Sequence, residues 1–224
     1  MRDTVLFGDC RKTLGTLKAQ ITTGIAEKPQ MCVTSPPYYG LRDYGGKEEQ
    51  IGMEQSPEEY IAEMVKVFSL VRDVLAEDGT LWVNIGDTYY NYRSDGNYPK
   101  QTVAKTRQDL PQNTPVRGNR LEGLKSKDLI GIPWMLAFAL RADGWWLRQD
   151  IIWHKPNPMP ESVRDRCTKS HEYIFLLSKS KNYKYDNEAI KEPVKQDWGT
   201  RNRTEGKYHN EGTGLQPHSG LTKS

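Results

Sequence analysis

Four consecutive residues near the amino terminus, Ser35, Pro36, Pro37 and Tyr38, combine groups that can act on an amine. The exocyclic amine of a nucleobase is a poor nucleophile because its lone pair is delocalised into the ring. Two acceptors beside its hydrogens would localise the lone pair, and the Ser35 hydroxyl with the Pro36 carbonyl is a suitable pair. The prolines add no competing N–H groups, and Tyr38 could stack on the base. Taken alone, the string is also typical of a plain turn.

A second candidate is Asp9, which follows the apolar run TVLFG at residues 4–8. This run is predicted to be a short strand, and in an open parallel sheet ligands collect outside the carboxyl ends of the strands. Ser35 follows the next predicted strand in the same way. We therefore expect both residues to lie at one edge of the sheet, although an aspartate in this place is equally typical of a helix cap.

The elements that must position these residues alternate along the chain. Ser56 and Glu59 form a capping box with Pro57 at the first helical position, and apolar residues follow at helical spacing. An apolar helix is predicted over residues 127–144, interrupted early by Pro133, and a weaker helical stretch lies between the first two strands. The predicted strands cover residues 4–8, 31–35, 80–86, 145–154 and 172–180.

This order predicts an α/β fold with a mostly parallel sheet and helices on both faces. The last two strands are joined without a helix, which predicts an antiparallel edge. After residue 186 the sequence becomes polar, glycine-rich and aperiodic. We therefore expect one catalytic domain over residues 1–186 and a flexible polar tail over residues 187–224, which would be the start of a missing region.

Composition excludes several classes of protein. No stretch approaches the roughly 20 apolar residues of a membrane span, and the start MRDTVLFGD is too charged for a signal peptide. The three cysteines lie far apart without C-x-x-C spacing, so we expect neither a disulfide framework nor a metal site. The chain has 36% hydrophobic residues, enough to bury a core, and its mean hydropathy of -0.79 indicates much loop. We expect a cytoplasmic protein.

The segment over residues 90–127 is locally basic, although the whole chain carries a net charge of only +3. It holds eight basic residues, including Arg117 and Arg120, against three acidic ones, and it has no apolar period. Such a long insertion in a compact domain is predicted to be a surface loop. It would either contact DNA phosphates or be an ordinary solvated loop.

The string TSPPYYGLRDYG resembles the catalytic motif of the amino-directed DNA methyltransferases, in the permuted subgroup that carries this motif near the amino terminus. The resemblance continues through LFGDC, GTLWVNIGDTY, KDLIGIPWMLAFALRADGWWLRQDIIWHKPNPMPES and HEYIFLLSKSKNYKYD. It implies a Rossmann-like methyltransferase fold, S-adenosylmethionine as cofactor and double-stranded DNA as substrate. The target base would be swung out of the duplex to reach the site.

Roles for individual residues are implied by the same resemblance. The S-P-P-Y string would be the catalytic loop. Asp9, with neighbouring Cys10, would contact S-adenosylmethionine. The proline-rich run WHKPNPMPES would form another wall of the target-base pocket, with Trp153 and Asn157 as its contributors.

One family motif is missing from the sequence. The family binds the methionine part of its cofactor with a D-P-F-x-G-S-G-type loop, and the glycines of this chain do not follow an apolar strand or open a helix. We therefore expect the amino-terminal part of a methyltransferase or one half of a split enzyme. A second chain or a missing segment would supply the glycine loop.

Three functions stay open from the sequence. The first is methylation of an exocyclic DNA amine, at N4 of cytosine or N6 of adenine. The second is a catalytically inactive DNA-binding remnant, and the third is an RNA or protein amide methyltransferase. Ser35 stands where many adenine enzymes carry aspartate and leans toward cytosine by resemblance, although a hydroxyl can accept from either base.

Overall fold

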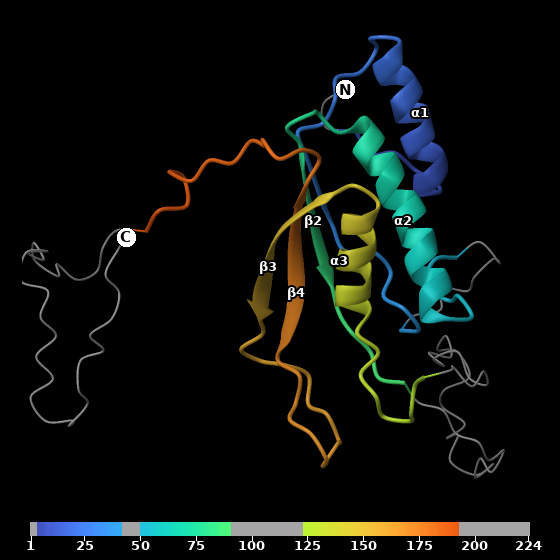
Figure 1. The fold of residues 1–224 in the computed structure, drawn as a ribbon, viewed down its shortest axis with the longest axis vertical. Coiled ribbons are helices and arrows are strands. Elements are labelled where there is room, and N and C mark those ends of the chain that lie inside the picture. Colours follow the sequence, from blue (N-terminus) through green and yellow to red (C-terminus); the bar gives the residue numbers. More distant parts are fainter. Residues whose placement is uncertain (1–3, 42–49, 91–122, 193–224) are drawn as a thin grey trace, which may run out of the picture. The chain divides into compact units, whose positions relative to one another are not determined.

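The computed structural model describes residues 4–41, 50–90 and 123–192 (Figure 1). The chain divides into two units, Met1–Tyr185 and Asp186–Ser224, and all the described helices and strands belong to the first. Most of the predicted tail lies outside the described residues, so the predicted domain limits stay a prediction. None of the described helices combines the length and apolar character needed to cross a bilayer.

A four-stranded mixed sheet forms the centre of the first unit, in the order β1-β2-β4-β3. β1 pairs with β2 in parallel, whereas β4 pairs with both β2 and β3 in antiparallel fashion. In the described sheet β1, β2 and β3 therefore run in one direction and β4 in the other, so the sheet is mixed, and only one of its strand pairs is parallel. The strands are β1 (Met31–Thr34), β2 (Thr80–Ile85), β3 (Trp146–His154) and β4 (His171–Ser178).

The antiparallel pairing follows from the connection between the last two strands. Residues 155–170 join β3 to β4 without a helix, and a parallel pair would need a crossover connection. The predicted antiparallel edge is thus confirmed, with β3 as its outer strand. β4 returns between β2 and β3, which brings the start of β4 beside the carboxyl end of β2.

Three helices accompany the sheet: α1 (Cys10–Thr22), α2 (Pro57–Val74) and α3 (Ile132–Ala142). α2 begins as predicted, because the Ser56 hydroxyl accepts a hydrogen bond from the Glu59 N–H at 3.2 Å and Pro57 occupies the first turn. α3 begins later than predicted. Pro133 lies in its first turn, where a missing N–H breaks no helical hydrogen bond.

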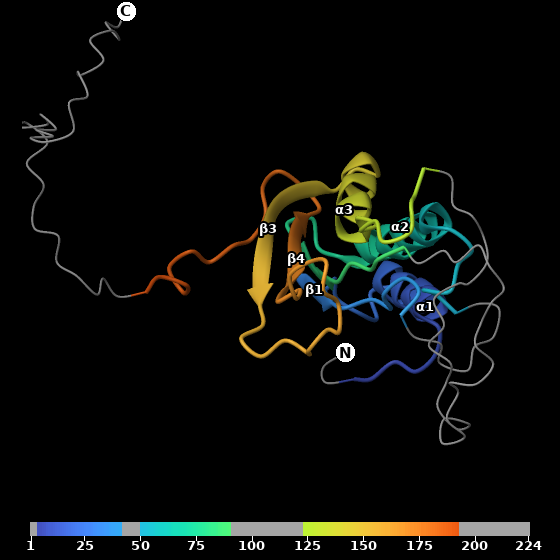
Figure 2. The same cartoon turned by 90° about the horizontal axis from the view of Figure 1, so that it is seen from below.

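The described helices all lie on one face of the sheet (Figures 1 and 2). Alternate residues of β2 and β4, such as Leu81, Val83 and Phe175, are buried in a core with α2 and α3. On the opposite face Val33 and Trp153 are 69% and 56% exposed. The expectation of helices on both faces is therefore wrong for the described part of the chain.

Residues 4–8 do not form the predicted strand. Val5 and Phe7 are 72% and 89% exposed. A strand is stable only when a neighbouring strand satisfies its backbone groups, and the described sheet offers these residues no such neighbour. The apolar run therefore resembled a strand in composition but lacks the pairing that would make it one.

Candidate active site

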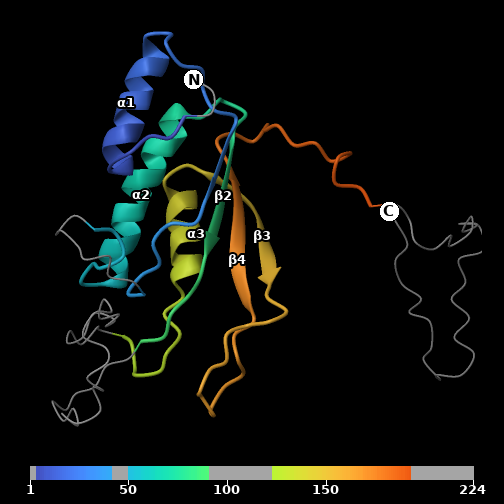
Figure 3. The ribbon, with the colours of Figure 1, turned by 180° about the vertical axis from the view of Figure 1, so that it is seen from behind.

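The carboxyl end of β1 opens into the loop that contains the S-P-P-Y string. The segments after β1 and β2, before α3 and between β3 and β4 all lie at this end of the sheet, which is the lower end in Figures 1 and 3. Ser35 and Pro37 are exposed, and Pro36 is buried. Ser35 and Pro37 therefore face outward at the carboxyl end of the strands, where the sequence predicted a site.

Contacts with two other segments hold the loop backbone in place. The hydroxyl of Tyr60, a fully buried residue of α2, donates to the Pro37 carbonyl at 2.8 Å. The Gly40 N–H donates to the Gly52 carbonyl at 2.8 Å. Gly52 has φ of +101°, and an added Cβ would lie 3.1 Å from the Tyr38 carbonyl oxygen, so only glycine suits this close approach.

The two predicted acceptors are left available by these contacts. Tyr60 occupies the Pro37 carbonyl, but the Pro36 carbonyl has no hydrogen-bond partner among residues 4–41, 50–90 and 123–192. The Ser35 hydroxyl makes one long contact, to Asn84 Oδ1 at 3.5 Å, in which the serine donates. Its lone pairs can therefore still accept a hydrogen bond from an incoming amine.

Tyr38 is half-buried and lies against the end of β2. A Cβ added to Gly86 would lie 2.7 Å from Tyr38 Cε2, so the absence of a side chain there makes room for the ring. The Tyr38 hydroxyl lies 3.1 Å from Asn84 Oδ1 and 3.2 Å from Glu172 Oε2. The aromatic ring is thus fixed at its edge and at its hydroxyl, by residues from β2 and β4.

Asn84 and Glu172 are site residues that the sequence reasoning did not single out. Asn84 is a polar side chain near the end of the apolar strand β2, and Glu172 is an acid near the start of β4. These two departures from apolar strand composition were the available signals. Neither signal indicated that the two side chains would meet at Tyr38.

The proline-rich run after β3 reaches the same place. Trp153 is paired with Glu172 in the β3–β4 ladder, and Lys155 forms an ion pair with Glu172. Burial raises the pKa of the Glu172 carboxyl, but the hydrogen bond and charge of Lys155, together with hydrogen bonds from Asn84 and Tyr38, outweigh it, so the net pKa is lowered. Asn157 is exposed beyond this contact. Its predicted role and that of Trp153 stay predictions.

Asp9 caps α1. Its carboxylate accepts from the Arg11 backbone N–H at 2.8 Å and from the Arg11 guanidinium at 2.7 to 3.1 Å. The side-chain hydrogen bonds of Arg11, together with its backbone N–H, lower the pKa of Asp9 to about 2. The alternative reading of Asp9 as a helix cap is confirmed, while cofactor contact by Asp9 and the exposed Cys10 stays a prediction.

A hollow of about 610 Å³ lies beside Arg11, between α1 and α2, with Ile51 and Met53 in its wall. Its wall carries three carboxylates, those of Glu54, Glu59 and Glu63, and two cations, Arg11 and Lys66. Both cations pair with Glu63, Arg11 at 2.6 Å and Lys66 at 3.0 Å. The Gly52 N–H donates to Glu54 at 2.9 Å. Since Gly52 also supports the S-P-P-Y loop, this hollow is adjacent to the candidate site.

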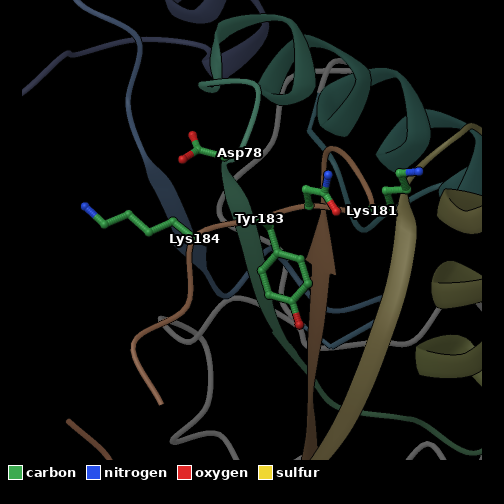
Figure 4. A pocket seen from close by; sticks show the side chains of 5 residues that line it. Asp78, Lys181, Tyr183 and Lys184 are labelled. Carbon is green, nitrogen blue, oxygen red and sulfur yellow. The ribbon is translucent and has the colours of Figure 1, made fainter. Parts of the chain in front are cut away.

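Figure 4 shows a different hollow, of about 550 Å³, lined by residues that include Asp78, Tyr183 and Lys184. Asp78 precedes β2 and Tyr183 follows β4, so this hollow lies at the end of the sheet away from Ser35. It takes no part in the candidate site. No group of three or more His, Cys, Asp or Glu side chains in the described residues could hold a metal ion.

The predicted basic insertion begins and ends next to the site. The Lys127 N–H donates to the Tyr90 carbonyl at 2.7 Å, and the Tyr90 N–H donates to the Asp128 carbonyl at 2.8 Å. The two ends of the insertion are thereby joined. Arg117 and Arg120 lie outside the described residues.

Sequence comparisons show which known proteins this chain resembles. A family model for N6 and N4 methyltransferases, described as DNA methylase, matches residues 30–217. The chain is 54% identical over 171 residues to the Type II methyltransferase M.Cfr9I of Citrobacter freundii, which covers 76% of this chain and 54% of that protein. It is 50% identical over 194 residues to the Type II methyltransferase M.SmaI of Serratia marcescens, which covers 85% and 60%.

Among solved structures, the PvuII DNA methyltransferase (cytosine-N4-specific) has a TM-score of 0.50 at 16% identity, over 80% of this chain and 50% of that one. This likeness concerns the fold alone. The chain spans 54% and 60% of the length of the two relatives named above. Because the family model matches residues 30–217, which is most of the chain, the chain belongs to the N6/N4 DNA methylase family.

Proposed function

We propose that this chain is the target-base half of a site-specific DNA methyltransferase of a restriction-modification system. In this proposal S-adenosylmethionine donates a methyl group to the exocyclic amine of a flipped cytosine or adenine in double-stranded DNA, in the cytoplasm. The observation that carries it is the pair of available acceptors, the Ser35 hydroxyl and the Pro36 carbonyl, on a loop held by Tyr60. The names of the relatives as Type II methyltransferases support it.

The proposed mechanism uses the loop to prepare the amine. The two N–H groups of the base amine donate to Ser35 Oγ and the Pro36 carbonyl, which localises the nitrogen lone pair away from the ring. When bound, S-adenosylmethionine would supply an electrophilic methyl group and leave as S-adenosylhomocysteine, and the methylated amine would release one proton to solvent. Because Pro36 and Pro37 have no N–H, no backbone donor of these residues competes with the amine for either acceptor. Trp153 and Asn157 complete the base pocket in this proposal.

The described residues fit the cofactor in part. The hollow beside Arg11 has three carboxylates and two cations in its wall, and Glu63 pairs with both cations. Glu54 and Glu59 would be the carboxylates left to face the positive charges of S-adenosylmethionine. The Asp9 carboxylate, however, is already bound by Arg11, and the sequence has no D-P-F-x-G-S-G-type loop. We therefore propose, in keeping with a permuted order of motifs, that a further segment or second chain supplies the glycine loop.

The outer edge of β1 is a suitable place for such a segment to join. β1 is the last strand at its end of the described sheet, and Met31 and Val33 are 55% and 69% exposed. An unpaired strand edge offers a row of backbone donors and acceptors to another strand. The catalytic domain of residues 1–186 would then extend its sheet at the edge that carries the S-P-P-Y loop.

The test is methyl transfer to duplex DNA with labelled S-adenosylmethionine. The chain is assayed alone and with the part of M.Cfr9I that it does not match, added as a separate polypeptide. We expect label on an exocyclic amine and at least a tenfold lower turnover for Ser35→Ala, which corresponds to about 1.4 kcal/mol. Ser69→Ala is the matched control, because Ser69 hydrogen-bonds Asp143 away from the loop. A ring-carbon methyl, or no transfer in either assay, would refute the proposal.

A further inference from the structure

We propose that Asn84 and Glu172 are positioning residues, which together orient the hydroxyl groups of Ser35 and Tyr38 for the target amine. This inference rests on the proposed function and deepens it. No motif in the sequence assigns a role to either residue. Contacts from β2 and β4 converge on the Tyr38 hydroxyl.

Asn84 has one fixed orientation. Its amide Nδ2 donates to the Tyr173 carbonyl of β4 at 3.3 Å, so its Oδ1 is the atom directed at the loop. That oxygen accepts from the Tyr38 hydroxyl at 3.1 Å and from the Ser35 hydroxyl at 3.5 Å. One amide oxygen therefore binds both hydroxyl groups of the S-P-P-Y string.

This arrangement determines whether the Ser35 hydroxyl donates a hydrogen bond to the base amine or accepts one from it. A serine hydroxyl has one proton and two lone pairs. When Asn84 accepts that proton, only the lone pairs of Ser35 are left for the base amine, which is what the proposed mechanism requires. The distance of 3.5 Å is long, and hydrogen bonds of a catalytic site are often long without substrate and shorten in the complex.

Glu172 provides the second acceptor for Tyr38. A phenol has one proton to donate, so the Tyr38 hydroxyl shares it between Asn84 at 3.1 Å and Glu172 at 3.2 Å. Lys155 pairs with Glu172 and favours its charged form. A charged acceptor forms the stronger hydrogen bond, so Glu172 helps Asn84 to hold the Tyr38 hydroxyl. The Asn84 oxygen has a second lone pair, which accepts from Ser35.

The same contacts join the two predicted walls of the base pocket. Lys155 belongs to the proline-rich run after β3, and Tyr38 belongs to the loop after β1. Glu172 contacts both of these residues, Tyr38 by a hydrogen bond and Lys155 by an ion pair. It is also paired with Trp153 in the β3–β4 ladder. A displacement of the run would therefore change the position of the Tyr38 ring.

The first test reads the position of Tyr38 directly and needs no methyl transfer. The chain is labelled with 3-fluorotyrosine, and the ¹⁹F resonance of Tyr38 is identified by its loss in Tyr38→Phe. We expect this resonance to move in Asn84→Ala and to stay in Thr80→Val. Thr80→Val is the matched control, since Thr80 lies on the same face of β2 and accepts a hydrogen bond from Trp82. An unmoved resonance in Asn84→Ala would overturn the inference.

The second test uses the methyl transfer assay. We expect kcat to fall about tenfold in Asn84→Ala, equivalent to about 1.4 kcal/mol, with the KM for DNA unchanged. In a Ser35→Ala background the same change should have a smaller effect, because the two residues act through one contact. Additive effects would refute the positioning role. The ¹⁹F test can support or refute the positioning role even if no methyl transfer is observed.

A conservative variant covers the case in which Asn84→Ala does not fold. Glu172→Gln keeps the shape and one acceptor oxygen but removes the charge that pairs with Lys155. We expect it to move the Tyr38 resonance and lower kcat at constant KM. A variant that folds and changes neither would show that Glu172 does not position the ring.

Discussion

Replacing Gly86 with alanine perturbs the candidate site without removing any of its functional groups. The added Cβ would lie 2.7 Å from Tyr38 Cε2 and 3.1 Å from Cδ2. Both distances are well inside the roughly 3.5 to 4.0 Å of a favourable carbon contact, so the ring must move. Its hydroxyl would then leave Asn84 and Glu172, which now lie within 3.2 Å.

The expected loss of stability is that of an overpacked buried position. Inserting a methyl group into a packed site costs about 1 to 3 kcal/mol, and Gly86 is buried. With a urea m-value of about 2 kcal/mol/M, the unfolding midpoint should fall by about 0.5 to 1.5 M. Turnover in the methyl transfer assay should fall as well, because Tyr38 is displaced.

Urea unfolding of the full chain, followed by circular dichroism, measures this change. Gly15→Ala is the matched control, because nothing lies within 4 Å of a Cβ added there and Gly15 is inside α1. Alanine at an exposed helical position should raise stability, by about 1 kcal/mol. An unchanged midpoint for Gly86→Ala would refute the placement of the Tyr38 ring against β2.

Three other outcomes are expected. The pKa of Asp9 is lowered from 3.8 to about 2, so its ionised carboxylate stabilises the fold above pH 4, and this stabilisation is lost as the pH falls toward 2. Asp9→Asn keeps the helix cap but not the charge, so its melting temperature should depend less steeply on pH in this range. Tyr60→Phe removes the hydroxyl that holds the loop carbonyl and should lower the free energy of unfolding by about 1 kcal/mol, measured in urea. Replacing Arg117 and Arg120 with alanine should flatten the plot of log DNA affinity against log salt by about one to two units, if both contact phosphates; an unchanged slope would favour a solvated loop.

Local signals in the sequence predicted several elements correctly. The start of α2 was predictable because the capping contact of Ser56 is made with a residue only three positions away. The strand at residues 4–8 was predicted wrongly because strand formation depends on a partner elsewhere in the chain, which composition does not show. The place of β4 between β2 and β3 likewise depends on distant pairing.

The candidate site was predictable where its polar groups lie in one short string. Ser35 and Pro36 supply their acceptors from adjacent positions, so the motif alone indicated them. Tyr38 instead meets Asn84 and Glu172 across separations of 46 and 134 residues. No spacing rule within one element reports such contacts, and only the return of β4 beside β2 brings them together.

The backbone hydrogen bonds that join Tyr90 to Lys127 and Asp128 have a consequence for the tolerance of the chain to changes in length. Because the frame itself holds the two ends together, the length of the intervening segment bears little on stability; each doubling of a flexible loop costs only about 0.6 kcal/mol. Insertions and deletions between residues 91 and 122 should therefore cost the fold little free energy of unfolding, because the hydrogen bonds of Tyr90 keep the flanking residues together.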